Sequence, residues 1–343
     1  MSLLTVTTQD KMLPLVVDTV LRENVGLSRI LGAAKKGKWQ GEQMKKTIKV
    51  SKNTTGGFFT GYDLLDTTAT DNLQQLAFAP KFRYKAVSLA GTDLAVNAVE
   101  STKIIDIAAQ AMESTAMDLS DDMGTDFYTG LGTGDTMNGL ANIIDDGGDA
   151  ATYGGLTRAT YTTLNSTDTA SSGSVSFVKL TTLFNAVSDG SQSPTLGLTT
   201  REIFALIESL FVTQENINKT VSEIKGGLTN GGGYTALYWK GVPIVADRKC
   251  ISGNFYYVNE DFLDFYALNP EGASALGYEA FKFKTVHEGS GSDVQPMGLG
   301  FSWGGWKKPI NQFAVVSQIM FAGNFISWNP RRHGRLTGIT SAA

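Results

Sequence analysis

The sequence predicts an α+β fold. Residues 97–128 carry apolar side chains at helical spacing, which predicts one long helix. Alternation of apolar and polar residues at 47–52 and 78–88, and the apolar run 310–326, predict β-strands. Glycine-rich breaks separate these segments. Helix and strand are therefore both expected, in long segments that do not follow a regular βαβ order.

Length and composition exclude several classes of protein. The chain has 343 residues, one cysteine and two histidines. This length suits two to three domains of ~100–200 residues, with a core large enough to need no covalent staple. Cys250 alone cannot form an intramolecular disulfide, and a structural zinc site usually takes four nitrogen or sulfur ligands. We therefore expect no metal and no cofactor.

Charge is unevenly distributed along the chain. The net charge is only −4, which argues against a general nucleic-acid binder. Residues 1–52 hold ten Lys and Arg against four Asp and Glu, whereas residues 100–150 hold one Lys against eleven Asp and Glu. Two such segments attract each other, within one copy or between copies. The alternative is that they form two separate solvated faces.

The N-terminal residues do not look like a targeting signal. Met1–Leu4 has no basic start and no long apolar stretch, and the chain has no run of about 18 apolar residues. We expect a soluble protein made in a cytosol, with no membrane span. Leu13–Leu21 has helical spacing and leads into the lysine-rich segment 35–52.

The alternating segments 47–52 and 78–88 predict a long two-stranded ribbon with a glycine-rich tip near 56–61. A lone ribbon of two strands is only marginally stable in water. We therefore expect the ribbon and the leading arm to lie against neighbouring copies of the chain.

The predicted helix 97–128 is about 45 Å long at ~1.5 Å per residue. Acidic residues follow its other side, and Gly130–Gly134 ends it. Residues 131–175 are rich in Gly, Thr, Ser and Asp and predict surface loops with short strands.

Further elements are expected in the second half of the chain. Helices are predicted at 176–188 and 200–214, the second with a capping box of Thr199 and Glu202. Strands are predicted at 234–239, 241–247, 254–258 and 335–339.

Motifs with catalytic or ligand spacing are incomplete. Residues 300–304 match G-x-S-x-G, with His333 downstream, but residues 303–332 contain no Asp or Glu to complete a Ser–acid–His order. Residues 32–38 have phosphate-loop spacing, but Trp39 stands where Ser or Thr is needed. The acidic loop 145–149 lacks the spacing of a calcium loop. We therefore expect no enzyme, and a structural or binding role instead.

The order of segments carries a resemblance. A strand and turn at Tyr84–Leu94 leads into the long helix, and a loop follows at Gly134–Leu140. A mixed region then contains Trp239–Asp247, and the chain closes with Asn329–Gly334. This arrangement resembles a tailed-bacteriophage major capsid protein of the Hong Kong phage ninety-seven type.

The resemblance implies a division of the chain. It comprises an N-terminal arm (1–38), an extended β-hairpin loop (39–88), a peripheral domain with a spine helix (89–139), an axial domain (140–309), a strand returning to the peripheral domain (310–326), and a C-terminal segment returning to the axial domain (327–343).

The resemblance also implies a function. Such a protein assembles into pentamers and hexamers of an icosahedral shell that encloses double-stranded DNA, within a virion built in the bacterial cytoplasm. A scaffolding protein (separate, since this sequence opens close to the arm), a portal and a decoration protein are implied partners, and packaged DNA is contacted only non-specifically. Alternatives are an encapsulin-type nanocompartment shell and another phage structural protein of the tail.

Contacts between subunits are expected at the basic and apolar residues of the arm and ribbon, at the acidic face of the long helix and near the C-terminus. The candidates are Lys35, Lys36, Lys38, Trp39, Lys45, Lys46, Lys49, Lys52, Phe58, Phe59, Asp118, Asp121, Asp122, Arg331 and Arg332.

Overall fold

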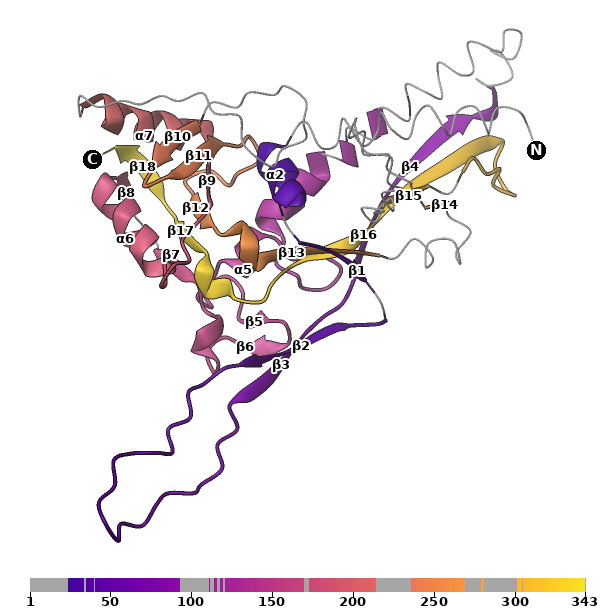
Figure 1. The fold of residues 1–343 in the computed structure, drawn as a ribbon. Helices are drawn as coiled ribbons and strands as arrows, with labels where there is room; N and C mark the ends of the chain where they lie inside the picture. Colours follow the sequence, from indigo (N-terminus) through magenta and orange to yellow (C-terminus); the bar gives the residue numbers. More distant parts are fainter. Residues whose placement is uncertain are drawn as a thin grey trace, which may run out of the picture.

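A computed structural model shows how these segments fold. The structure describes residues 24–33, 35–39, 41–92, 111, 114–115, 118–119, 121–169, 173–213, 236–268, 279–280, 301–303 and 305–342. The α+β class is confirmed by two six-stranded sheets with helices beside them (Figure 1). The helix predicted near Leu13–Leu21 lies outside the described residues. No described helix has the length and apolar character needed to cross a membrane.

The first sheet is organised around β16 (Ala314–Ser327), which confirms the strand predicted at 310–326. Its order is β1 (Lys35–Trp39), β13 (Leu263–Leu268), β16, β15 (Phe301–Trp303) and β14 (Glu279–Ala280). The sixth strand, β4 (Lys81–Ala90), pairs antiparallel with β16 along its whole length.

The second sheet has the order β10 (Ala236–Trp239), β11 (Val242–Ala246), β9 (Leu196–Thr199), β12 (Phe255–Val258), β17 (Gly334–Leu336) and β7 (Thr167–Thr169). The strands predicted at 234–239, 241–247 and 254–258 are thereby confirmed. The strand predicted at 335–339 is instead two strands, β17 and β18 (Ile339–Ala342), because Gly338 turns the chain between them with φ 70°. β18 pairs with β8 (Gly173–Val175).

Two amphipathic helices cover part of the second sheet. Helix α6 (Phe177–Val187) begins after Ser176, whose hydroxyl accepts a hydrogen bond from the Lys179 N–H. Helix α7 (Arg201–Thr213) is also confirmed, but the predicted capping box is wrong. Thr200 caps this helix through the Ile203 N–H, because Thr199 is the last residue of β9 and donates its hydroxyl to the Asn254 carbonyl.

The predicted long helix is described only in its C-terminal half. Residues 121–129 are helical, as are 111, 114–115 and 118–119, and the helix ends before Gly130 as expected. Leu119, Met123 and Phe127 are buried along the predicted apolar stripe. The rest of 97–128 lies outside the described residues.

The projecting ribbon differs from the predicted one in its second strand. β2 (Met44–Lys49) pairs antiparallel with β3 (Leu73–Phe78), so that only Phe78 of the predicted partner segment 78–88 pairs with it. Pro80 lies between β3 and β4 and has no N–H to continue a ladder, so the chain leaves the ribbon there and enters the first sheet. The ribbon points away from both sheets, and residues 51–72 form its tip (Figure 1).

The arm is part of the core from residue 24 onward, so the expectation that it lies on neighbouring copies is wrong for the described residues 24–39. Leu27 and Ile30 of α2 (Val25–Ala33) are buried, because their apolar faces meet the core. The Gly26 N–H donates to the Asp247 carboxylate at 2.7 Å, and Arg29 pairs with Glu260 at 2.9 Å. β1 then adds parallel to β13.

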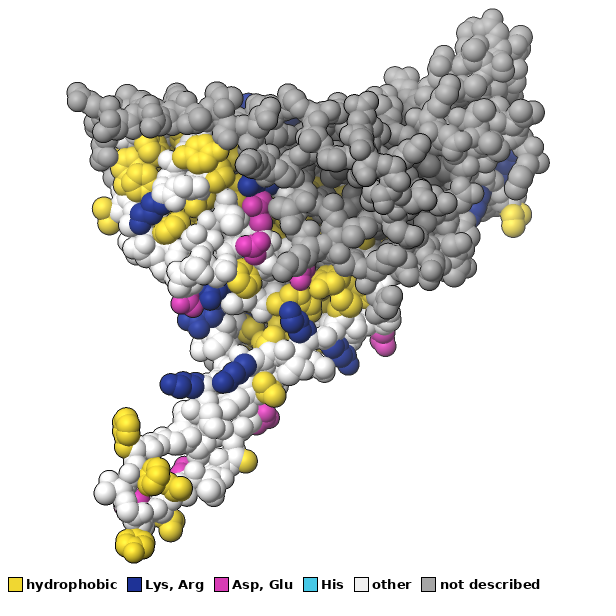
Figure 2. All heavy atoms as spheres, in the orientation of Figure 1, with side chains coloured by type: hydrophobic (Ala, Val, Ile, Leu, Met, Phe, Trp, Pro, Cys, Tyr) yellow, Lys and Arg dark blue, Asp and Glu magenta, His cyan; other side chains and the backbone are white. Residues whose placement is uncertain are grey.

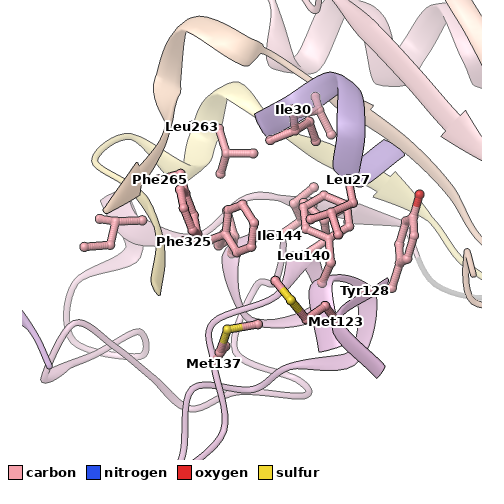
Figure 3. Packing of buried hydrophobic residues seen from close by; sticks show 14 of the residues in the cluster. Leu27, Ile30, Met123, Tyr128, Met137, Leu140, Ile144, Leu263, Phe265 and Phe325 are labelled. Atoms are coloured by element: carbon pink, nitrogen blue, oxygen red, sulfur yellow. The ribbon is translucent and has the colours of Figure 1, made fainter. Parts of the chain in front are cut away.

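The larger core cluster lies where this arm meets the helix and the first sheet. Residues 140–144, expected to be surface loop, form the buried helix α5 (Leu140–Ile143) and its end, because four of these five side chains are apolar. Figure 3 shows residues that pack there from segments far apart in sequence: Leu27, Ile30, Met123, Tyr128, Met137, Leu140, Ile144, Leu263, Phe265 and Phe325.

Because α2 is core, truncating Ile30 will destabilise the subunit. We expect Ile30→Ala to lower the free energy of unfolding by about 2–5 kcal/mol, since a fully buried side chain is lost and a cavity remains. Urea denaturation followed by tryptophan fluorescence measures this.

The matched control is Ile310→Ala, which removes the same atoms from a fully exposed side chain and should change stability by less than about 0.5 kcal/mol. Equal denaturation midpoints for the two variants would show that α2 is not part of the folded core.

Candidate functional site

The ribbon tip exposes large apolar side chains. Phe58, Tyr62 and Leu64 are fully exposed, and Phe59 and Leu65 are more than half exposed. We call these five residues the apolar tip (Figure 2). No described residue covers them. Several large apolar side chains exposed on one projecting segment are unfavourable in water and commonly mark an interaction site.

The tip is acidic as well as apolar. Asp63, Asp66 and Asp71 lie in it, and no Lys or Arg occurs between Lys52 and Lys81. Hydrogen bonds from the side chain and backbone of Thr68 lower the pKa of Asp66. The Asp66 carboxylate therefore stays ionised at neutral pH, and the tip offers a partner both apolar surface and acidic side chains.

The ribbon stem carries the predicted lysines. Lys45, Lys46, Lys49 and Lys52 are all exposed, and lysines gather at the stem in Figure 2. The Lys46 ammonium lies 4.9 Å from the centre of the Trp328 ring. These four residues are available to a partner surface, as are Phe58 and Phe59 at the tip.

Three apolar tip residues were missed from the sequence pattern: Tyr62, Leu64 and Leu65. Their signal is a group of large apolar residues in a segment with neither helical nor strand periodicity, after the glycines at 56, 57 and 61. Residues outside a helix or strand have no regular face that packs against a core. The absence of periodicity could therefore have indicated that these three side chains are exposed.

The acidic helix face is paired within its own chain. The Asp122 carboxylate forms ion pairs with Arg83 and Lys85 of β4, each at 2.8 Å, and Arg83 also pairs with Asp126. Partial burial raises the pKa of Asp122, but hydrogen bonds from Lys85 and Arg83 outweigh it and the pKa is lowered. Asp121 pairs with Lys249, while Asp118 is exposed. These partners of Asp121 and Asp122 lie outside residues 1–52, so the attraction expected between the basic segment and the acidic segment stays a prediction.

Trp39 is also used inside the chain. Its side chain is 1% exposed, its indole N–H donates to the Gly41 carbonyl at 3.1 Å, and its ring packs edge-on against Tyr266. A side chain so buried offers no surface to a partner, so we leave Trp39 out of the proposed contact residues.

The remaining candidates lie at the two ends of the chain. The backbone of Lys35, Lys36 and Lys38 belongs to β1. Arg331 is exposed, whereas Arg332 pairs with Asp189 at 2.9 Å.

The geometry around Ser302 and His333 does not match a hydrolase site. Ser302 lies within β15, paired with Met320, and not on a strand-to-helix turn. His333 is buried; its Nδ1 accepts the Asn259 N–H at 3.2 Å, and its Nε2 lies 3.0 Å from the Ser327 hydroxyl. The proton must then be on Nε2, which donates to Ser327 and cannot act as its base. Burial lowers the pKa of His333 to about 3.

The acidic loop 145–149 is held by arginine. The buried Asp145 accepts the N–H groups of Gly147, Asp149 and Ala150. Arg335 of β17 contacts three carboxylates, those of Asp145, Asp149 and Asp168, at 3.2, 2.5 and 2.6 Å. Arg335 therefore ties the loop 145–149 to the second sheet, and its positive charge faces the carboxylates of the loop.

Comparison with known proteins adds evidence about the fold. No protein-family model matches the chain, and no curated protein matches its sequence. Solved structures match at low identity. The capsid asymmetric unit of cyanophage A-1(L) aligns with a TM-score of 0.70 and 15% identity, over 90% of this chain and 92% of that chain.

Two other structures align over similar spans. The holo-SrpI encapsulin complex of Synechococcus elongatus PCC 7942 gives a TM-score of 0.56 and 10% identity, over 91% of this chain and 87% of that chain. The capsid of a native GTA particle gives 0.51 and 9%, over 92% and 90%. The chain thus has the Hong Kong phage ninety-seven-type capsid fold, as the order of its segments predicts.

The buried neutral His333 makes stability depend on pH. An unfolded histidine takes up a proton near pH 6.5, whereas the folded one does so only near pH 3. The contribution of the neutral His333 to the free energy of unfolding is fully present above pH 6.5 and is lost as the pH falls toward 3. Between pH 7 and 4.5 this amounts to about 2–3 kcal/mol of unfolding free energy.

His333→Gln is the matched comparison, because a glutamine amide can accept from Asn259 and donate to Ser327 without titrating. We expect its denaturation midpoint to fall less than that of the unmodified protein over this pH range. The same loss in both proteins would contradict the assignment.

Proposed function

We propose that this chain is the major capsid protein of a tailed bacteriophage, which assembles as pentamers and hexamers into an icosahedral shell around double-stranded DNA. The apolar tip is the observation that carries the proposal. Five large side chains stand on a ribbon that points away from the body of the subunit. Likeness to the capsid structures of a cyanophage and of a GTA particle over about nine-tenths of the chain supports it.

Burial of the apolar tip on another copy would provide the driving force. Burying one large apolar side chain contributes about 1.5–3 kcal/mol. Association of two copies costs rotational and translational freedom, so one such contact gives a weak pair. Closed symmetry repeats the contact around the shell, which makes the assembly far more stable than any one interface.

We keep the division into domains as part of this proposal. The peripheral domain would contain 89–139 and the returning strand at 310–326, the axial domain 140–309, and the C-terminal segment 327–343 would return to the axial domain. The membership of β17 in the second sheet supports the last assignment. β13 pairs with β16, which suggests that residues 263–268 are shared with the peripheral domain.

The proposal extends to partners and location. A scaffolding protein, a portal and a decoration protein would accompany the shell, and packaged DNA would touch its wall only non-specifically. The protein would be assembled in the bacterial cytoplasm and reside in the virion. Its role would be structural and not enzymatic, which the donor role of the His333 Nε2 supports.

An encapsulin-type shell is the second candidate, because the encapsulin complex shares the fold. Its TM-score of 0.56 is lower than the 0.70 of the cyanophage capsid. Purified particles distinguish the two: nuclease-protected DNA inside indicates a capsid, whereas a co-purifying cargo enzyme indicates a nanocompartment. Open helical stacks in micrographs would instead favour a tail protein.

The apolar tip is tested by Phe58→Ser combined with Phe59→Ser. We expect each interface to weaken by at least about tenfold, because two apolar side chains lose their burial. Shells should be replaced by free subunits or open capsomers in sedimentation velocity and negative-stain micrographs.

The control is Thr54→Ser with Thr67→Ser, which changes two exposed polar residues of the same segment and should assemble normally. Closed shells at unchanged yield from the double phenylalanine variant would rule out the role of the tip in assembly.

A further inference from the structure

We infer that Gly154 and the hairpin of β5 (Thr152–Tyr153) and β6 (Leu156–Thr157) set the direction in which the ribbon leaves the subunit, and thereby position its tip for shell closure. This inference rests on the proposed function. It concerns the ribbon root, defined here as residues 76–79, and not the tip that makes the contact.

Close backbone approach holds the ribbon root against this hairpin. The Ala77 N–H donates to the Gly154 carbonyl at 2.9 Å. A Cβ at Gly154 would lie 2.6 Å from Leu76 Cδ2 and 2.9 Å from Phe78 Cζ, distances that packed carbon atoms do not adopt. Leu76 and Phe78 are both buried. A side chain at residue 154 would therefore force Leu76 or Phe78 to move away from the hairpin.

Aromatic packing fixes the hairpin to the first sheet. Phe78 packs edge-on against Tyr153 and Trp328, with ring centres 5.2 and 5.7 Å apart. The Tyr153 hydroxyl donates to the Ser327 carbonyl and accepts the Ser327 N–H, at 2.8 and 2.9 Å. Ser327 is the last residue of β16. These contacts therefore fix the direction of the ribbon relative to the central strand of the first sheet.

A second connection holds the end of the ribbon root. The buried Asn324 of β16 donates its amide to the Ala79 carbonyl at 3.0 Å, and its amide oxygen accepts the Asn138 N–H at 2.9 Å. The side-chain hydrogen bonds of the tip, by contrast, join tip residues to one another, as between Asn53 and Thr70. The root is thus attached to the body at several points.

The length of the ribbon makes its root angle important. The segment from Lys49 to Gly61 can reach at most about 40 Å at ~3.3 Å per residue, so a tilt of about 10° at the root displaces the tip by up to about 7 Å. A displacement of this size exceeds the range of apolar contact, which is about 4–4.5 Å. Small changes at the root should therefore prevent a shell from closing.

Gly154→Ala tests the inference, and Gly155→Ala is its matched control. Both glycines have positive φ, 57° and 82°, so both variants carry the same kind of backbone strain. A Cβ at Gly155 meets nothing within 4 Å. The difference between the two variants therefore reports the clash with the ribbon.

The direct measurement is a distance from the ribbon to the body. Spin labels at Thr54→Cys and Thr182→Cys occupy exposed positions on the tip and on α6. Cys250 is buried and burial raises the pKa of its thiol, so it should not take up label. Diluting labelled chains in unlabelled protein limits the dipolar signal to pairs within one subunit.

We expect Gly155→Ala to keep the distance distribution of the unmodified ribbon and to form normal shells. Gly154→Ala should shift that distribution by about 5 Å or more, or broaden it, and should give open or misshapen shells in micrographs. Identical distances and shells for the two variants would overturn the inference.

A second pair of variants approaches the same contact from the ribbon and covers the case in which Gly154→Ala fails to fold. Leu76→Ala removes the buried side chain that faces Gly154, and Leu73→Ala makes the same change at an exposed position of the same strand. Leu76→Ala should broaden the distance distribution, whereas Leu73→Ala should not. No difference between them would contradict the inference.

These results are separable from the proposed function. Absence of closed shells in the unmodified protein would refute the proposed function itself. Normal shells of the unmodified protein together with identical shells from Gly154→Ala would refute only the positioning role of the ribbon root.

Discussion

The backbone pairing of β16 is the constraint on which the rest of the structure depends. This strand bonds to β4 and β15 on its two sides, and to β13 near its C-terminal end. Phe321 and Phe325 lie in the main core, while Asn324 and Ser327 hold the ribbon root and the β5–β6 hairpin. One long strand can therefore join the core to the ribbon.

This attachment separates the stability of the folded chain from the association with other copies that we propose. The buried ends of the ribbon belong to the core, so the subunit does not need the tip to fold. The tip keeps exposed apolar surface that a monomer would not retain without a use. An assembling subunit requires this combination: a stable body, and a projecting surface whose burial comes only from another molecule.

The candidate site was predictable in part. The stem lysines and Phe58 and Phe59 are exposed as expected from a charged ribbon with a glycine-rich tip. Asp121 and Asp122 are paired within the chain, because the β4 face that carries Arg83 and Lys85 packs beside the helix. Composition shows that a segment is acidic, but only the tertiary structure shows which basic residues pair with it, and here they lie outside the basic segment 1–52.

The sequence by itself determined the fold class, most of the strands and the helices α6 and α7, because alternation and helical spacing are local properties of the chain. The tertiary structure decided which strands pair: residues 81–90 alternate as predicted but bond to β16 and not to β2. It also decided that α2 and residues 140–144 are core. Pairing and burial depend on segments far apart in sequence, so local periodicity could not predict them.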